Sequence, residues 1–502
     1  MQKAKVALTN FQFGEVSPSL ISRTDTRVYN NSAQKIENFF LRAEGGVIKR
    51  AGLKKIYEFD TSIDTAKVQQ HRLVPFIFSD DERYIVSLEH QKIRVFQIDT
   101  SNNVTLAATL TADSSGATIP ITNLNMHEVT YAQAGDVMFI AHQTFMVRKL
   151  VRTGLTSFQM ETKTFDTQSA GAKIYQPYFQ FQDLGVTLDP SASSGNGITL
   201  TTSEAYWDLT GSQSGGNFPD SKHVGLTIKY HDQEITITSV QSATQATGNA
   251  LATLKKKLKV DSFRTDNGVA TVEVTLVNHG FSASDAFTIS NANTVGGISA
   301  SNLNGARTVA EVIDDNTFTF NAGGNANDSV AGGGTPFLET HAPATNWSEQ
   351  SYSVLRGFPG AVTFHQNRLW YAGTISQPDG LWASKSNQFF NFDIGDASDN
   401  DSIDIRAAIG EVNTIKHLVS NRDLQAFTST DEFIVPAFVE KPTTPTNATI
   451  KRQTPFGASF VRPYVFDGAT VYIQGSGEIV REMLFDDGQN AYTGQPISSL
   501  AS

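Results

Sequence analysis

The side chains best suited to binding a metal ion lie in an acidic run, NFDIGDASDNDSIDI, at residues 391–405. Calcium takes about six to eight oxygen ligands, and clustered carboxylates supply them. Asp396, Asp399 and Asp401 are therefore candidate ligands, although their spacing is not that of an EF-hand loop. The alternative is a solvated loop between the third and fourth of the repeated units described below. Beyond this candidate, the sequence predicts no metal and no cofactor.

Patterns that would indicate catalysis are missing from the sequence. It has no H-E-x-x-H, no Walker A loop and no G-x-S-x-G elbow, and it has no cysteine to serve as nucleophile, disulfide partner or thiolate ligand. Carboxylate pairs could serve a glycosidase, but a chain with 50 acidic residues contains such pairs by chance. Trp370, Tyr371 and Trp382 could form a platform for sugars, yet their strand spacing favours packing between sheets. We assign no catalytic residue and expect no enzymatic activity.

Four arginines are candidates for structural or inter-subunit contacts. They are Arg23, Arg50, Arg368 and Arg481, and each has glycine or acidic residues nearby in the sequence. The planar fork of arginine suits fixed ion pairs, so removing the charge of Arg23 or Arg368 is expected to impair assembly.

Two further positions are predicted to be structural. Asp25 is placed to cap a short helix that runs to about Asn31. Trp382 is expected to pack between sheets.

A segment ending in LATLKKKLK, residues 251–259, favours a helix with a solvated basic end.

Composition limits the class of protein. The chain has 502 residues, of which 39% are hydrophobic and 18% charged, which predicts a globular protein with several cores. The amino terminus lacks the apolar run of a signal peptide, and no stretch approaches the ~18 apolar residues of a membrane span. The formal net charge of −11 disfavours broad binding to a phosphate backbone. An acidic wall would instead let DNA pass without sticking, although acidity also serves solubility.

Five units of the chain share the pattern strand, turn, strand, turn, strand. Apolar and polar residues alternate in them, as they do in antiparallel sheets. Gln366-Asn367 and Asp467-Gly468 are tight reversals between such strands. The five units span residues 72–98, 129–151, 356–392, 415–435 and 463–485.

Repeated units of three or four short antiparallel strands indicate the blades of a β-propeller. A row of β-sandwiches uses the same strand pattern, and we prefer the propeller because the units are short and similar in size. The fold class is therefore mainly β, with a propeller-like domain interrupted by an inserted β-rich platform. The expected organisation is an N-terminal arm (1–60), first blades (61–155), an insert (156–345) with a small β module at about 265–322, and further blades (346–502).

Three phrases of the chain resemble one family. They are FGEVSPSLISRTDTRVY…IENFFLRAEGGVIKRAGL, GFPGAVTFHQNRLWYAG…LWASKSNQFFNF, and LVSNRDLQAFTSTDEFIV with QTPFGASFVRPYVFDGATVYIQGSGEIVRE. Together they are similar to the tail tubular protein B, or nozzle, family of short-tailed (podovirus-type) bacteriophages. The likeness covers roughly residues 1–155 and 345–500. Separately, NHGFSASDAFTIS…VIDDNTFTF resembles a small β module common in phage tail proteins.

The resemblance implies a structural virion protein made in the host cytoplasm. It implies a homo-oligomer, a ring of six copies that forms the distal channel for genome ejection. The ring docks on a tail adaptor protein, carries tail fibre proteins, and lets double-stranded DNA through. Relatives usually continue past the phrase ISSLAS, so the strands that complete the propeller are expected from the amino terminus or from another chain. Two alternatives stay open: a tail-associated polysaccharide-degrading enzyme, and a monomeric propeller that serves as a binding module.

Overall fold

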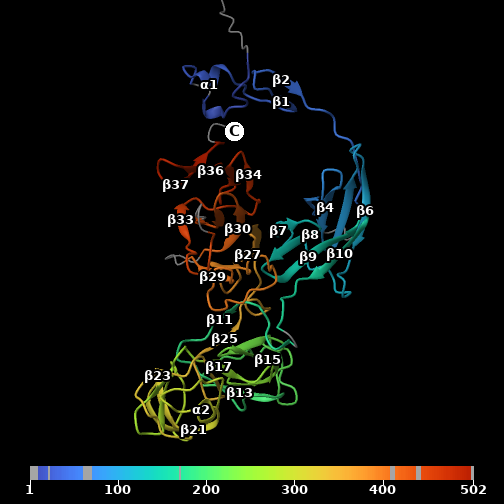
Figure 1. Cartoon of the computed structure of the whole chain (residues 1–502). Helices are drawn as coiled ribbons and strands as arrows, with labels where there is room; N and C mark the ends of the chain where they lie inside the picture. The colour runs from blue at the N-terminus through green and yellow to red at the C-terminus, as the bar shows by residue number, and fades with distance from the viewer. Residues whose placement is uncertain are drawn as a thin grey trace, which may run out of the picture.

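The protein is almost entirely β in a computed structural model, as the sequence predicts. Its strands form a row of five four-stranded sheets, two larger sheets between the second and third of these, and a small N-terminal hairpin (Figure 1). The structure describes residues 10–20, 23–59, 70–168, 171–407, 413–436 and 442–498.

Each four-stranded sheet is an antiparallel meander, which we call a blade and number in chain order. The first blade consists of β3 (Arg72–Ile77), β4 (Arg83–Glu89), β5 (Lys92–Ile98) and β6 (Val104–Leu110). The second consists of β7 (Thr130–Ala134), β8 (Val137–His142), β9 (Phe145–Gly154) and β10 (Ser157–Thr162). The third consists of β26 (Ala361–His365), β27 (Arg368–Ala372), β28 (Gly380–Ala383) and β29 (Ile403–Arg406).

The last two blades follow without an interruption. The fourth consists of β30 (Ile415–Ser420), β31 (Leu424–Thr428), β32 (Glu432–Val435) and β33 (Lys451–Thr454). The fifth consists of β34 (Tyr464–Phe466), β35 (Ala469–Ile473), β36 (Val480–Asp486) and β37 (Ala491–Pro496). The predicted reversals are confirmed, because Gln366 and Asn367 have φ of 48° and 56° and Asp467 has φ of 49°.

Consecutive residues of the inner strands enter cores on opposite sides of a blade, because side chains alternate across a strand. Met138 packs against the first blade, and its neighbour Phe139 packs against the third. Trp370 packs toward the fourth blade, and Tyr371 packs toward the second. A blade between two others is therefore apolar on both faces.

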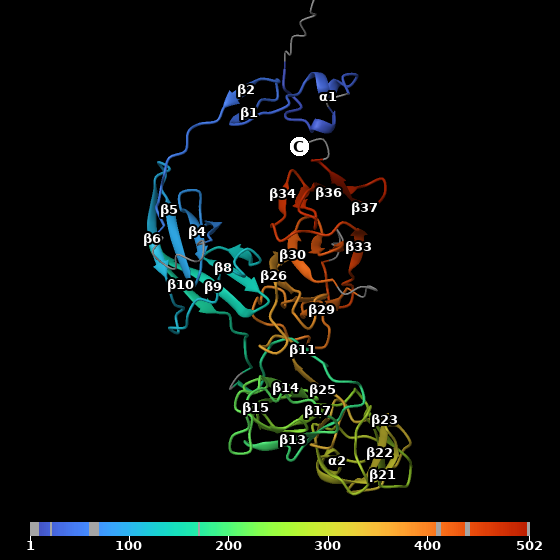
Figure 2. The same cartoon turned by 180° about the vertical axis from the view of Figure 1, so that it is seen from behind.

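The five blades follow an arc around a common axis (Figures 1 and 2). Neighbouring blades touch through β6 and β10, β7 and β26, β26 and β30, and β33 and β37. The first and fifth blades form the two ends of the arc and lie apart in both views. The arrangement is propeller-like, with an opening between its first and last blades.

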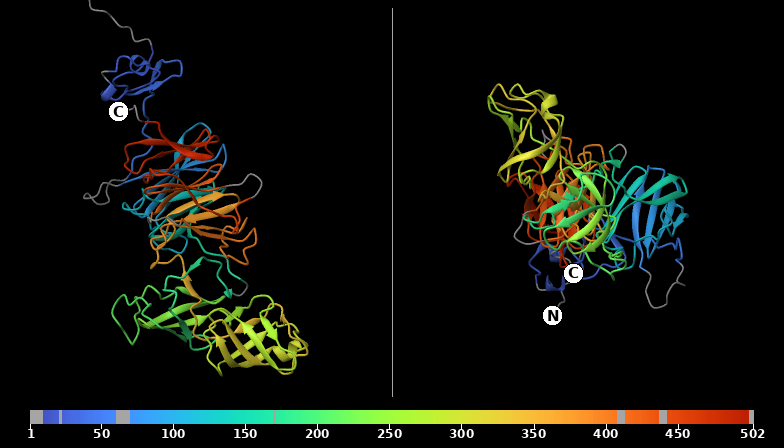
Figure 3. Two further views of the ribbon diagram at one scale, coloured as in Figure 1. Left: turned by 90° about the vertical axis from the view of Figure 1, so that its left-hand side faces the viewer. Right: turned by 90° about the horizontal axis from the view of Figure 1, so that it is seen from below.

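The insert between the second and third blades forms two sheets with separate cores. The seven-stranded sheet has the order β11 (Tyr178–Phe179), β25 (Trp347–Gln350), β14 (Thr227–Tyr230), β15 (Gln233–Ser242), β16 (Gln245–Ala250), β13 (Ile198–Thr202) and β12 (Leu188–Pro190). The eight-stranded sheet has the order β17 (Lys255–Lys257), β24 (Phe337–Glu339), β20 (Ala286–Ser290), β21 (Gly305–Asp314), β22 (Thr317–Asn321), β19 (Thr271–Thr275), β18 (Phe263–Thr265) and β23 (Ala331–Gly332). A short helix, α2 (Ala300–Leu303), precedes β21. The insert projects from the arc on the side opposite the N-terminal residues (Figure 3, left).

The helix predicted to end in LATLKKKLK is wrong. Its basic residues form β17, which pairs with β24. Leu254 and Leu258 have the spacing of one helical face, but Leu254 lies in the core of the seven-stranded sheet and Leu258 in that of the eight-stranded sheet. The segment therefore crosses from one core to the other in an extended conformation.

The N-terminal residues form a small module with its own hydrogen bonds. It contains a turn of 3₁₀ helix (Pro18–Leu20), α1 (Arg27–Asn30), β1 (Phe39–Leu41) and β2 (Val47–Lys49). The prediction that Asp25 caps the helix is wrong, because the side chain of Thr26 accepts the N–H of Tyr29 and is the N-cap. Among the described residues, no helix has the length and apolar character needed to cross a membrane.

Candidate functional site

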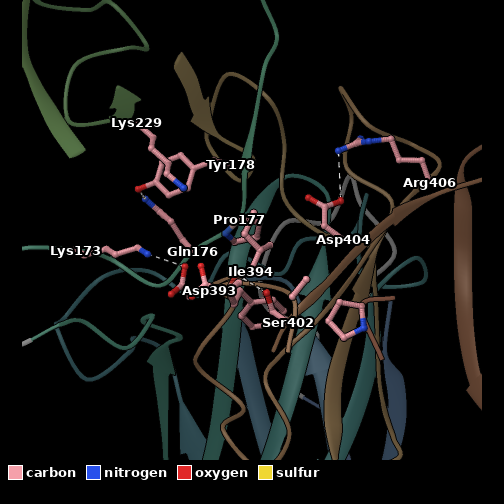
Figure 4. Close-up of a pocket in the computed structure, with 15 residues that line it drawn as sticks. Lys173, Gln176, Pro177, Tyr178, Lys229, Asp393, Ile394, Ser402, Asp404 and Arg406 are labelled. Carbon is pink, nitrogen blue, oxygen red and sulfur yellow. Dashed lines mark hydrogen bonds and ion pairs between the residues drawn. The ribbon is translucent and has the colours of Figure 1, made fainter. Parts of the chain in front are cut away.

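A cavity of about 480 Å³ lies at the neck, where the insert joins the third blade (Figure 4). The chain entering the insert supplies Lys173 and Tyr178, and β14 supplies Lys229. The loop between β28 and β29 supplies Asp393, and β29 itself supplies further polar side chains. The volume is in the range of small-molecule sites, so the polar groups decide what the cavity can do.

Two contacts between the insert and the third blade brace the neck. The Nζ of Lys173 lies 2.7 Å from an oxygen of Asp393 and joins the insert to the third blade. The guanidinium of Arg406 lies 4.0 Å from the ring centre of Phe179, which is a cation–π distance. Within β29, Arg406 also lies 3.5 Å from Asp404. The contacts of Lys173 and of Phe179 fix the insert relative to the third blade.

Burial sets the protonation of the cavity walls. Burial, with the nearby carboxylate of Glu234, raises the pKa of Tyr178 well above its usual value, so the phenol stays neutral. Burial and the charge of Lys173 lower the pKa of Lys229. Burial raises the pKa of Asp404 to about 6, although Arg406 opposes this. The cavity therefore holds paired charges and one carboxyl group that titrates near neutrality.

The axis of the arc is filled by side chains from its inner strands. The hollow at the axis has a volume of only about 10 Å³, and it is lined by Arg72, Tyr131, Val362, His417 and Arg462. The guanidinium of Arg462 stacks 3.9 Å from the ring centre of Tyr131, which ties the segment just before the fifth blade to the second blade. The axis of a single chain is thus a packed core rather than a ligand funnel.

A buried histidine lies in this axial cluster. The Nε2 of His417 lies 3.0 Å from the carbonyl oxygen of Ser459, to which it donates. Burial lowers the pKa of His417 to about 4, and the positive charges of Arg72, Arg462 and Lys416 contribute. The ring is therefore neutral at physiological pH.

The two end blades expose apolar faces that the middle blades bury. On β3, Leu73 is 60% exposed and Ile77 is 58% exposed, while Val74 and Phe76 between them pack against the second blade. On β34, Tyr464 is 73% exposed. The inner strand of the third blade, β26, is buried or half-buried throughout. The faces beside the opening therefore have the composition of buried sheets without a neighbour.

The structure does not gather the candidate metal ligands. An oxygen of Asp401 lies 2.7 Å from the Nζ of Lys385. An oxygen of Asp396 lies 3.4 Å from the Nζ of Lys257. Asp399 contributes its carbonyl oxygen to Arg368. Among the described residues, no group of three or more acidic or histidine side chains is placed to hold a metal ion. The acidic run is also not a loop between blades, because its end forms β29 inside the third blade.

Arg368 anchors that acidic loop. It is 2% exposed, and its guanidinium donates to the carbonyl oxygens of Ser384 at 2.8 Å, Asp399 at 2.7 Å and Asp401 at 2.5 Å. These acceptors are backbone carbonyls of the same chain, so the contacts differ from the ion pairs expected from the sequence. The guanidinium holds the loop between β28 and β29 against β27.

Arg481 and Arg50 likewise bond to neutral groups of their own chain. Arg481 donates to Gln474 at 2.8 Å and to the carbonyl oxygen of Gly494 at 2.8 Å. Arg50 donates to the side-chain oxygen of Asn38 at 3.1 Å. Both therefore stabilise local structure within this chain.

Arg23 and Asp25 form an exposed ion pair of 3.0 Å in the N-terminal module. Trp382 is buried in the third blade, where its ring lies 5.1 Å from that of Tyr352. Trp370 and Tyr371 are buried as well, so these aromatics pack between blades and form no exposed platform for sugars. The roles of Arg23 and Asp25 in assembly stay predictions.

Sequence reasoning missed most of the neck and the axis. Asp404 was visible in the acidic run, but Lys229 and Tyr178 gave no local signal, because they lie far from it in the chain. His417 stands in a strand predicted from alternation, where a polar residue on a buried position could have marked it.

Comparisons with known proteins leave the family open. No family model and no curated protein sequence matches the chain. Among solved structures, the endosialidase of phage phi92 aligns with 69% of this chain at 12% identity and a TM-score of 0.16, and the chain spans 61% of its length. Apo AztD from Citrobacter koseri aligns with 86% of this chain and 97% of its own at 10% identity and a TM-score of 0.20. These TM-scores are too low to indicate a shared overall fold.

Proposed function

We propose that this chain is a structural subunit of the tail nozzle of a short-tailed bacteriophage. Copies of it form a ring, six by resemblance to the tail tubular protein B family, around the distal channel for DNA. The ring docks on a tail adaptor and carries tail fibres. The chain is made in the host cytoplasm and acts in the virion.

The observation that carries the proposal is where the resembling phrases lie in the fold. The first forms the N-terminal module, the second forms the third blade, and the last forms the fourth and fifth blades. The second and last phrases thus form three consecutive blades of the arc, the first forms the N-terminal module, and the insert lies outside all of them. A likeness that follows the architecture supports a shared role better than scattered matches do.

The physical features support a part that works by shape. The axis is packed, and the neck is braced by the Lys173–Asp393 ion pair and by Arg406 over Phe179, so the insert is held as a projecting body. The formal net charge of −11 suits a wall past which DNA moves without adhering. The insert is the proposed platform for fibres.

The test is to image purified phage particles with an antibody fragment against the insert. We expect labels around the tip of the tail in a ring, and a mass-spectrometric copy number near that of other six-fold tail proteins. Particles without the chain, or with the label on the capsid, would refute the proposal. Light scattering of the purified chain adds the oligomeric state.

A polysaccharide-degrading enzyme is the competing proposal. Such an enzyme needs two carboxyl groups on either side of the glycosidic bond: a protonated one that acts as general acid and an ionised one that acts as nucleophile or general base. In the neck cavity Asp393 is paired with Lys173, and Asp404 lies beside Arg406. Incubation with host capsule or cell-wall polysaccharide distinguishes the two, because release of reducing ends would favour the enzyme. Loss of that release in Asp404→Asn would place it in the cavity.

A further inference from the structure

The opening of the arc is lined by apolar side chains from both end blades. From the first blade come Leu73 and Ile77, on the face turned away from the second blade. From the fifth blade come Tyr464, Phe466 and Leu484, while Met483 beside Leu484 packs toward the fourth blade. Side chains this apolar are normally covered, and a contiguous exposed patch marks a binding surface.

The β1–β2 hairpin is apolar on both of its faces. Phe39, Leu41 and Val47 share one face, and Phe40 and Ile48, which are paired in register, share the other. Each of these side chains is exposed. Strands that are apolar on both faces are typical of strands covered on both sides, and an isolated two-stranded hairpin is at best marginally stable in water.

The arm that carries the hairpin already lies on one wall of the opening. The rings of Tyr57 and Phe96 are 4.9 Å apart, and the guanidinium of Arg94 lies 5.5 Å from the ring centre of Phe59. Phe96 alternates with Val95, which faces the second blade, so the arm contacts the face beside the opening. Figures 1 and 2 both place the hairpin beyond the arc on the side where the first and fifth blades end.

Charge favours the opposite wall as the partner of the hairpin. Residues 10–59 carry eight basic and five acidic side chains, a formal net charge of +3. Residues 464–496 of the fifth blade carry one basic and five acidic side chains, a formal net charge of −4. The two segments therefore attract each other over a distance of about a Debye length, ~8–10 Å.

We propose that the β1–β2 hairpin docks into the opening of its own arc, between the first and fifth blades, and completes the propeller-like body. The six residues between Arg50 and Tyr57 span roughly 20 Å when extended, which gives the hairpin a wide reach. A short tether produces an effective concentration in the millimolar range. At micromolar protein, docking within one chain is thus favoured about 10³-fold over docking onto a second copy. This closure concerns one chain, whatever assembly it joins.

Cross-linking tests the contact directly, because the chain has no cysteine of its own. Glu482 lies on the face of the fifth blade beside the opening, since it pairs with Val471 and Gln495 and alternates with Met483. We expect Lys49→Cys with Glu482→Cys to be joined by a short bismaleimide within one chain. The control pair, Lys49→Cys with Val277→Cys on the insert, should stay unlinked. Absence of the link, or a link found only between chains, would overturn the proposal.

Hydrogen exchange provides a second measurement. We expect the amides of residues 39–49 to be protected in the parent chain. In the Tyr464→Asp, Phe466→Asp variant they should exchange at least about tenfold faster, because the fifth blade's side of the opening becomes charged and no longer binds the apolar hairpin. These side chains are exposed, so the fold of the fifth blade should survive the change. Leu184→Asp, an equally exposed site on the insert, is the control and should leave exchange unchanged. Equal exchange of residues 39–49 in the parent and the variant would contradict docking.

Discussion

Replacing His417 by glutamine should make the arc less sensitive to acid. His417 is 4% exposed, and its pKa is about 4 in the folded chain, against about 6.5 in an unfolded one. At low pH the unfolded chain binds a proton that the folded chain does not, so stability is fully present above pH 6.5 and is lost as the pH falls toward 4. At pH 5 this one ring costs about 2 kcal/mol relative to neutral pH.

The glutamine side chain keeps an N–H donor for the carbonyl oxygen of Ser459 but cannot be protonated in this range. Urea unfolding at pH 7.5 and pH 5 can be followed by tryptophan fluorescence, to which Trp370 between the third and fourth blades contributes together with three other buried tryptophans. We expect the parent to lose about 2 kcal/mol more between the two pH values than His417→Gln does. The exposed His127, changed to glutamine, is the control and should behave as the parent. Parallel pH profiles for parent and His417→Gln would refute the reasoning.

Other substitutions test the buried polar groups. Arg368→Met should destabilise the chain by about 3 kcal/mol or more, because it leaves three carbonyl acceptors without their donor, while Arg23→Ala in the exposed ion pair should change the melting temperature little. Asp404→Asn tests the opposite pH dependence. Because the pKa of Asp404 is raised to about 6, this group makes the parent lose stability as the pH rises from about 4 to 7, and in urea titrations the variant should avoid about 2 kcal/mol of that loss. Lys163→Met should raise the melting temperature at neutral pH, because the ammonium of Lys163 is buried over the ring of Phe165 with no hydrogen-bond acceptor among the described residues. Burial also lowers the pKa of Lys163, which shows that its charge is costly there. A lower melting temperature would contradict this.

Three strands of every blade could be predicted from the sequence, and the fourth could not. The inner strands are buried by neighbours, so selection for packing leaves an alternating or continuous apolar pattern. The outermost strands are β6, β10, β29, β33 and β37, and several are half-exposed or carry polar residues, as KRQT of β33 does. Without burial on either face, no periodic signal remains to mark such a strand.

Errors arose where distant parts of the chain decide local structure. The i, i+4 spacing of Leu254 and Leu258 predicts a helix only if both residues share a core, and they belong to two. The acidic run predicts clustered carboxylates only if no cation is near, and Lys385 and Lys257 approach Asp401 and Asp396. Both outcomes depend on tertiary contacts that spacing along the sequence does not contain.

The exposed strand β34 shows that the end blades are built for burial. Its sequence, YVF, is as apolar as the inner strand β26 of the third blade, yet only β26 has neighbouring blades on both sides. If the hairpin fills the opening, that apolar surface is used within one chain, and copies must meet through other faces. In the proposed ring, we then expect the insert to be among the surfaces that set its geometry. A ring held by heterologous contacts closes only if those contacts impose the right rotation, so in the proposed ring we expect the neck at Lys173 and Asp393 to matter more for assembly than the apolar opening does.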